Sequence, residues 1–197
     1  MSMFLGPIHY WVYGKVQLQD ELTKRFAERA QREGWLADVD RYVVEEDRPL
    51  EELIVGGNIH GSLQSMIHGS EERFAQLVTT IVKDHPERLD VLDEEAYEFG
   101  REHQVQADAN ALDGWKQLRN VLQDGMPCDQ VAMMTHKKPE YVAWEQLQDV
   151  HGGFWKEVGG DPENYARLRA QVAAGILSSS KLRLQENDSF FQLTQHA

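Results

Sequence analysis

The chain has 197 residues, of which 41% are hydrophobic and 27% are charged. This length and composition are typical of a globular protein with a substantial core, and they exclude an intrinsically disordered chain. The formal net charge is −13, and a surface that acidic repels phosphate backbones and anionic lipids. We therefore expect neither a nucleic-acid partner nor a membrane partner.

Three further features favour a cytoplasmic protein. The single cysteine, Cys128, cannot form an internal disulfide, which fits a reducing compartment. No apolar run approaches the length of a membrane span. The first basic residue is Lys15, so we expect no signal peptide, which would carry a charged N-terminal region.

Helical periodicity dominates the first half of the chain. Pro7 is suited to the first turn of a helix, and the apolar spacing that follows predicts a helix ending near Gly34. Residues 34–50 form a connector, whose fragment "RYVV" leans toward β structure but is too short to build a sheet alone. Asn58 is a good N-cap for a second long helix, which we expect to end near Lys83.

Helical segments are also predicted for the second half. Pro86 opens a region of helical spacing that continues to Leu122, where "DGMP" ends it. A short helical turn is expected around Gln130–Met134, followed by a helix from Pro139 to Gly159. Pro162 then opens a last clear helix, with apolar residues along one face.

These elements predict an all-α fold, a single-domain helical bundle of about five to six helices over residues 1–178. Residues 179–197 are expected to form a C-terminal tail, with "SFFQL" as the segment that would dock it on the bundle.

Three predicted helices carry a histidine in one register, in "IHYWVYGKV", "IHGSLQSMI" and "VHGGFWKEV". His9, His60 and His151 each border an apolar stripe, and neutral imidazole is the commonest metal ligand. Three histidines with an open fourth position would suit a divalent metal such as zinc or iron, or the same site could hold a small molecule. The competing interpretation gives each ring only a structural hydrogen bond at the core edge. The first two rings can meet only if the connector lets both helices start at one end.

Carboxylates and aromatic residues supply the remaining candidates. Glu98 and Glu102 repeat at a four-residue interval, and either could serve as an extra ligand or general base. A solvated face neutralised by a neighbouring arginine is the simpler interpretation. Tyr10, Tyr13 and Trp155 are candidate residues for the wall of a pocket.

Several known metal motifs are absent from the sequence. It contains no Glu-x-x-His, which argues against a ferritin-like di-iron site, and no His-x-x-x-His, which argues against a zinc protease. Histidines on several helices are similar in architecture to hemerythrin-like and DinB-like bundles. The ligand spacings of those families do not occur here, so no ligand is carried over.

Three functions follow as hypotheses. The first is a bundle with an internal histidine-lined site for a metal or small ligand, either a metal-dependent hydrolase or a metal-binding protein. The second is a non-catalytic, chaperone-like protein whose acidic surface holds a basic partner. The third is a helix-turn-helix regulator formed by "VAMMTHKKPEYVAWEQL", which the acidic charge disfavours. No catalytic residue, substrate or oligomeric state is assigned.

Overall fold

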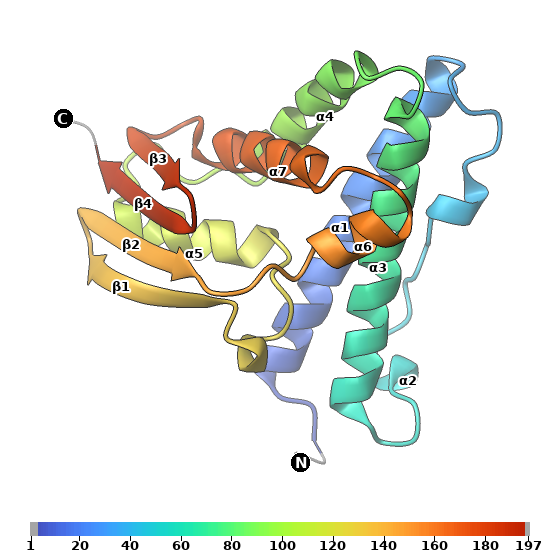
Figure 1. The fold of residues 1–197 in the computed structure, drawn as a ribbon. Coiled ribbons are helices and arrows are strands. Elements are labelled where there is room, and N and C mark those ends of the chain that lie inside the picture. Colours follow the sequence, from blue (N-terminus) through green and yellow to red (C-terminus); the bar gives the residue numbers. More distant parts are fainter. Residues whose placement is uncertain (1–3, 196–197) are drawn as a thin grey trace. The chain divides into compact units, whose positions relative to one another are not determined.

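The computed structural model describes residues 4–195 and has a mixed α+β architecture. Within this range it contains seven α-helices and one four-stranded antiparallel sheet (Figure 1). The chain divides into two compact units. Unit 1 contains the chain up to Arg88 together with Gly153–Asp161, and unit 2 contains Leu89–Gly152 together with the chain from Pro162 onward. Over residues 4–195, no helix is both long and apolar enough to cross a membrane.

Two long helices, α1 (Pro7–Arg32) and α3 (Ile59–Val82), form the framework of unit 1. Both begin where the sequence predicts: Pro7 lies in the first turn of α1, and the Asn58 side chain accepts a hydrogen bond from the Gly61 N–H of α3. The two helices run parallel (Figure 1). Parallel packing is achieved because the connector carries the chain back to the end at which α1 begins.

The connector and a later segment complete unit 1. The connector contains a short 3-10 helix, η1 (Asp40–Tyr42), and the single turn α2 (Leu50–Leu53). The short helix α6 (Gly152–Glu157) packs on α3, where the fully buried Trp155 ring lies 6.1 Å from that of Phe74.

Unit 2 is organised around the sheet, whose strands lie in the order β1-β2-β4-β3. Two hairpins form it: β1 (Ala132–Lys138) with β2 (Tyr141–Gln146), and β3 (Leu182–Asn187) with β4 (Phe190–Gln195). A two-residue loop closes each hairpin, and Asp188 in the second loop has φ 53°, a conformation that aspartate tolerates. Pairing of β2 with β4 joins the hairpins.

Unit 2 also contains three helices and a 3-10 turn. They are α4 (Arg88–Glu102), α5 (Ala111–Val121), η2 (Pro127–Asp129) and α7 (Pro162–Leu177). Helix α5 packs on one sheet face, where Val142 and Leu193 are fully buried. Gly114 permits this approach, because a Cβ there would lie 2.5 Å from a methyl group of Leu182.

The prediction of an all-α bundle is wrong. Residues expected in a helical turn near Gln130–Met134 and in a helix from Pro139 instead form the β1–β2 hairpin. The helix-turn-helix hypothesis for the same segment fails with it, because two strands provide no recognition helix. The spacing of Tyr141, Leu147 and Val150 satisfies a helical period locally. Pairing with the distant β4 strand outweighs that local preference.

Candidate functional site

Unit 2 contains a cavity of about 1050 Å³. One face of the sheet, one face of α5, one face of α7 and the loop 147–152 form its walls. Ligand cavities in proteins usually span a few hundred to about a thousand cubic ångströms, so this volume accommodates an organic molecule of considerable size.

The sheet wall consists of alternate residues, because successive side chains of a strand point to opposite faces. Met134, Trp144, Phe191 and Glu186 are paired across the four strands, and all four line the cavity. The Trp144 and Phe191 rings are stacked, with centroids 5.4 Å apart and planes inclined by only 4°. Together they give the cavity an aromatic surface.

Helix α7 presents small side chains to the cavity. They are Ala166, Ala170, Ala173 and Ala174. Their three- and four-residue spacing places them on one helix face. An alanine side chain ends at Cβ, so the helix can stand beside the sheet without filling the space between them. The cavity therefore owes much of its volume to this alanine face.

Helix α5 contributes an aromatic residue flanked by cations. The Trp115 ring lines the cavity, with Arg119 Cζ 5.6 Å and Lys137 Nζ 6.0 Å from its centroid. Both cations also line the cavity, Arg119 from the next turn of α5 and Lys137 from β1. These distances are at the outer range of cation–π interaction.

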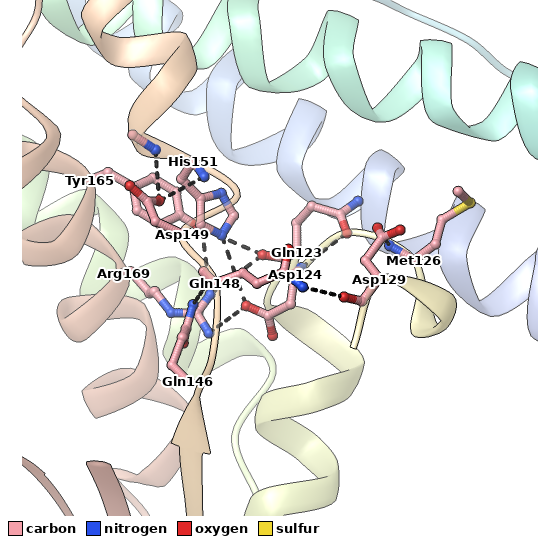
Figure 2. A network of polar contacts seen from close by, with 11 residues as sticks. Gln123, Asp124, Met126, Asp129, Gln146, Gln148, Asp149, His151, Tyr165 and Arg169 are labelled. Atoms are coloured by element: carbon pink, nitrogen blue, oxygen red, sulfur yellow. Dashed lines mark hydrogen bonds and ion pairs between the residues drawn. The ribbon is translucent and has the colours of Figure 1, made fainter. Parts of the chain in front are cut away.

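A polar cluster of four side chains, Asp124, His151, Tyr165 and Arg169, lies at another part of the cavity wall (Figure 2). The Tyr165 hydroxyl is 3.1 Å from His151 Nε2, and the two rings stack with centroids 4.0 Å apart. Arg169 Nη2 is 2.7 Å from Asp124 Oδ1, which is also 4.0 Å from His151 Nε2. Charged and neutral hydrogen-bonding groups are thus gathered at one place.

The cluster is supported by its local backbone. Asp149 Oδ1 accepts hydrogen bonds from the N–H groups of His151 and Gly152, at 2.9 and 2.8 Å, and so fixes the turn that carries the imidazole. The preceding residue, Gln148, donates its side-chain amide to the carbonyl oxygen of Asp129 at 2.9 Å (Figure 2). Tyr165 and Arg169 lie one turn apart on α7 and therefore project from the same helix face.

Electrostatics keep Arg169 charged. Burial disfavours the charged guanidinium, but the carboxylate of Asp124 and hydrogen bonds to Asp124 and Tyr165 outweigh it, so the pKa of Arg169 is raised. Glu186 lies near this arginine at the cavity wall. Burial and the negative charge of Glu163 raise the pKa of Glu186, although Arg169 acts in the opposite direction.

This arrangement can recognise polar groups on a ligand. The Tyr165 hydroxyl can donate or accept a hydrogen bond, and the imidazole nitrogens of His151 can do either according to tautomer. Arg169 donates hydrogen bonds to Asp124 and, at a longer distance of 3.4 Å, to the Tyr165 oxygen. A ligand oxygen or nitrogen at this end would meet both donors and acceptors.

Among the histidines predicted as ligands, His9 and His60 are brought together within unit 1. Their ring centroids are 5.8 Å apart, because the parallel helices α1 and α3 begin side by side. His9 is buried and its Nδ1 accepts a hydrogen bond from the Gly6 N–H at 2.9 Å, which places the proton of the neutral ring on Nε2. His60 is exposed.

The third histidine, His151, belongs to unit 2, so the convergence of all three rings stays a prediction. Across residues 4–195, no group of three or more His, Cys, Asp or Glu side chains is arranged to hold a metal ion. Of the residues predicted for the site, His151 is the one that lines the cavity of unit 2.

The other predicted site residues lie elsewhere. Tyr10 is exposed and donates to the Glu51 carboxylate, a hydrogen bond that raises the pKa of the phenol. Tyr13 is buried, which raises its pKa, and its hydroxyl donates to the Arg48 carbonyl oxygen at 3.3 Å. Trp155 belongs to the core of unit 1.

The two predicted carboxylates lie on the exposed surface of α4. Glu98 forms an ion pair of 3.0 Å with Arg101, and Glu102 is also exposed. This is the neutralised, solvated face that the sequence offered as the simpler interpretation.

Most of the cavity residues were missed by the sequence analysis. Tyr165 and Arg169 stand four residues apart on a correctly predicted helix, beside alanines at helical spacing, which is a signal that could have indicated a functional face. The alternation in "LRLQENDSFFQLTQ", interrupted by Asn-Asp-Ser, is typical of a hairpin and could have revealed Phe191 as an inward residue.

Comparison with known proteins adds no assignment. No protein-family model matches this chain, and no curated protein or solved structure matches it either.

Proposed function

We propose that unit 2 binds a small organic molecule in the cavity between its sheet and helices α5 and α7. The observation that carries this proposal is the cavity itself, about 1050 Å³ in volume and lined by the stacked rings of Trp144 and Phe191. Ligand sites are typically concave and mostly apolar, with a few convergent polar groups that fix orientation. The cavity has both properties.

Its apolar part selects for shape. The rings of Trp144 and Phe191 are stacked with nearly parallel planes, so a flat ring system can add to the stack. The alanine face of α7 projects no bulky side chain into the cavity. It therefore leaves room for several fused or linked rings. The ligand is therefore a flat, largely hydrophobic molecule.

Its polar part selects for hydrogen bonding. Tyr165 and His151 line the cavity and are 3.1 Å apart, so a polar group of a ligand can join an existing hydrogen-bonded pair. The expected ligand carries an oxygen or nitrogen that reaches the polar cluster while its rings lie on the aromatic surface.

Binding of a neutral fluorescent probe, N-phenylnaphthylamine, tests the proposal. The probe is almost non-fluorescent in water and brightens in an apolar cavity, and we expect one saturable site per chain. Ala170→Phe, which puts a ring into the cavity, should weaken binding at least tenfold. Gln171→Phe is the matched control, because Gln171 is the next residue on α7 and does not line the cavity.

Two checks make the result decisive. Ala174→Phe fills the cavity at a second alanine and should behave as Ala170→Phe does. Circular dichroism identifies any variant that has lost its fold. Absence of saturable binding to the unmodified protein, or equal affinity of the Ala170 and Gln171 variants, would refute a ligand-binding role for the cavity.

A further inference from the structure

We infer that the ligand of this cavity is an amphiphilic anion, whose acidic group lies against Lys137 and Arg119 while its rings lie on Trp144 and Phe191. This inference rests on the proposed function and specifies the class of ligand. An aromatic acid, in which a flat hydrophobic ring system carries one carboxylate or sulfonate, has the required chemistry.

Two cations lie together at one part of the cavity wall. Lys137 and Arg119 come from different elements, β1 and α5, yet both approach the same Trp115 ring at the cavity wall. The chain has 33 acidic against 20 basic residues, so two cations meeting at one indole run against its average charge. Like charges brought together favour an anion between or beside them.

The contacts of Lys137 leave its charge available. Within residues 4–195 its ammonium group has the Trp115 ring as a neighbour and forms no ion pair with a carboxylate. Its charge is available to a ligand. Lys138, the next residue, pairs with Tyr141 in the sheet and points to the opposite face.

The end of the cavity at the polar cluster does not suit the anion. Arg169 is the cation there, but Asp124 already binds it at 2.7 Å. Glu186 and Glu163 add negative charge around this arginine. A ligand carboxylate would be repelled from this end and attracted to the end at Lys137.

The sheet presents different groups in a fixed order along the cavity. Along β1, Lys137 is paired with Val142, Met134 with Trp144, and Ala132 with Gln146, so the sheet presents cationic, aromatic and polar rows in succession. Four residue steps of β2, from Val142 to Gln146, separate the first and last rows, which corresponds to roughly 13 Å. A molecule of two or three rings, with an acid at one end and a hydrogen-bonding group at the other, spans this distance.

The test compares two probes that differ by one group. Anilinonaphthalene sulfonate carries a sulfonate, and N-phenylnaphthylamine has the same ring skeleton without it. Lys137→Glu should weaken binding of the sulfonate probe about tenfold and change the affinity of the neutral probe less than twofold. Lys138→Glu makes the same change of net charge on the opposite sheet face and should leave both affinities within twofold.

Salt provides a second readout. Raising sodium chloride from about 20 mM to about 500 mM should weaken binding of the sulfonate probe to the unmodified protein, because the ions screen an exposed charge pair. Binding of the neutral probe should not weaken.

The outcomes separate the two proposals. Failure of both probes to bind refutes the ligand-binding function and this inference with it. Binding of both probes, with equal effects of the Lys137 and Lys138 variants or equal losses for the two probes, overturns the anionic class of ligand and leaves the binding function standing. Retained binding of the neutral probe to Lys137→Glu shows that the substitution has not collapsed the cavity.

Discussion

Replacement of Arg169 by methionine gives a quantitative test of the polar cluster. Arg169 and Asp124 are separated by 2.7 Å, and their side chains are 23% and 14% exposed. At an effective dielectric constant of 20, the attraction at this distance is about 6 kcal/mol, and desolvation of the two groups offsets about half of it. Because the substitution leaves the Asp124 carboxylate in a mostly buried position, we expect the free energy of unfolding to fall by about 2–3 kcal/mol.

Arg101→Met is the control for this substitution. Arg101 lies on α4 and pairs with Glu98, and the two side chains are 51% and 55% exposed. An exposed pair contributes at most about 1 kcal/mol, so the control should lose much less stability. The pKa of Arg169 is raised from an ordinary value that is already high. The arginine is therefore charged in the folded and unfolded states across the neutral range, and the difference should not depend on pH there through this group.

Urea unfolding at neutral pH measures these changes. With a slope of about 2.5 kcal/mol per molar urea, a loss of 2–3 kcal/mol moves the midpoint by about 1 M. The double variant Asp124→Asn/Arg169→Met removes both charges and should be less destabilised than the sum of the single variants by about 1–2 kcal/mol. Additive single losses, or equal losses for Arg101→Met and Arg169→Met, would refute the argument that the Asp124–Arg169 pair is buried and coupled.

Three other perturbations address separate features, each followed by urea unfolding. Glu186→Gln should stabilise by at most about 0.5 kcal/mol at pH 7, because burial raises the pKa of this carboxyl. That gain should vanish below the ordinary pKa of 4.5, where the carboxyl is protonated in both folded and unfolded states, and a gain independent of pH would contradict the assignment. Asp149→Ala should cost about 1 kcal/mol because two backbone N–H groups lose their acceptor, whereas Asp149→Asn keeps an acceptor oxygen; equal losses would show that the turn does not need it. Gly175→Ala should cost about 2–3 kcal/mol, because a Cβ would lie 2.1 Å from the Tyr97 carbonyl oxygen, while Gly14→Ala meets no atom within 4 Å and should stabilise α1 by about 0.5–1 kcal/mol. The same sign for both glycine substitutions would count against the close approach of α4 and α7.

Helix starts were predictable because their signals are local. Pro7 and Pro162 need only their own fixed φ to favour a first turn, and the Asn58 side chain caps a helix by bonding three residues ahead. The structure confirms all three positions. None of these signals depends on a residue far away in the chain.

The sheet was not predictable in the same way. Strand β2 holds its place by pairing with β4, and Trp144 meets Phe191 across 47 residues of sequence. Its six residues read equally well as a helical turn until that partner is known.

The candidate site was hard to predict for the same reason. The sequence indicated His151 as a candidate metal ligand, but its contacts with Asp124 and Tyr165 depend on the return of α7 beside the loop that follows β2. A periodicity argument can place a residue on the face of one element, and it cannot say which element faces it.

The path of the chain between the two units has a consequence for synthesis on the ribosome. Unit 1 needs Gly153–Asp161, which place Trp155 against Phe74, so it cannot be completed until most of unit 2 has already been translated. Until then β1 and β2 exist without β4, and the unpaired edge of β2 is open to other chains. Nascent molecules of this protein must therefore pass through a stage at which neither half is finished, and chaperone capture would be most useful there.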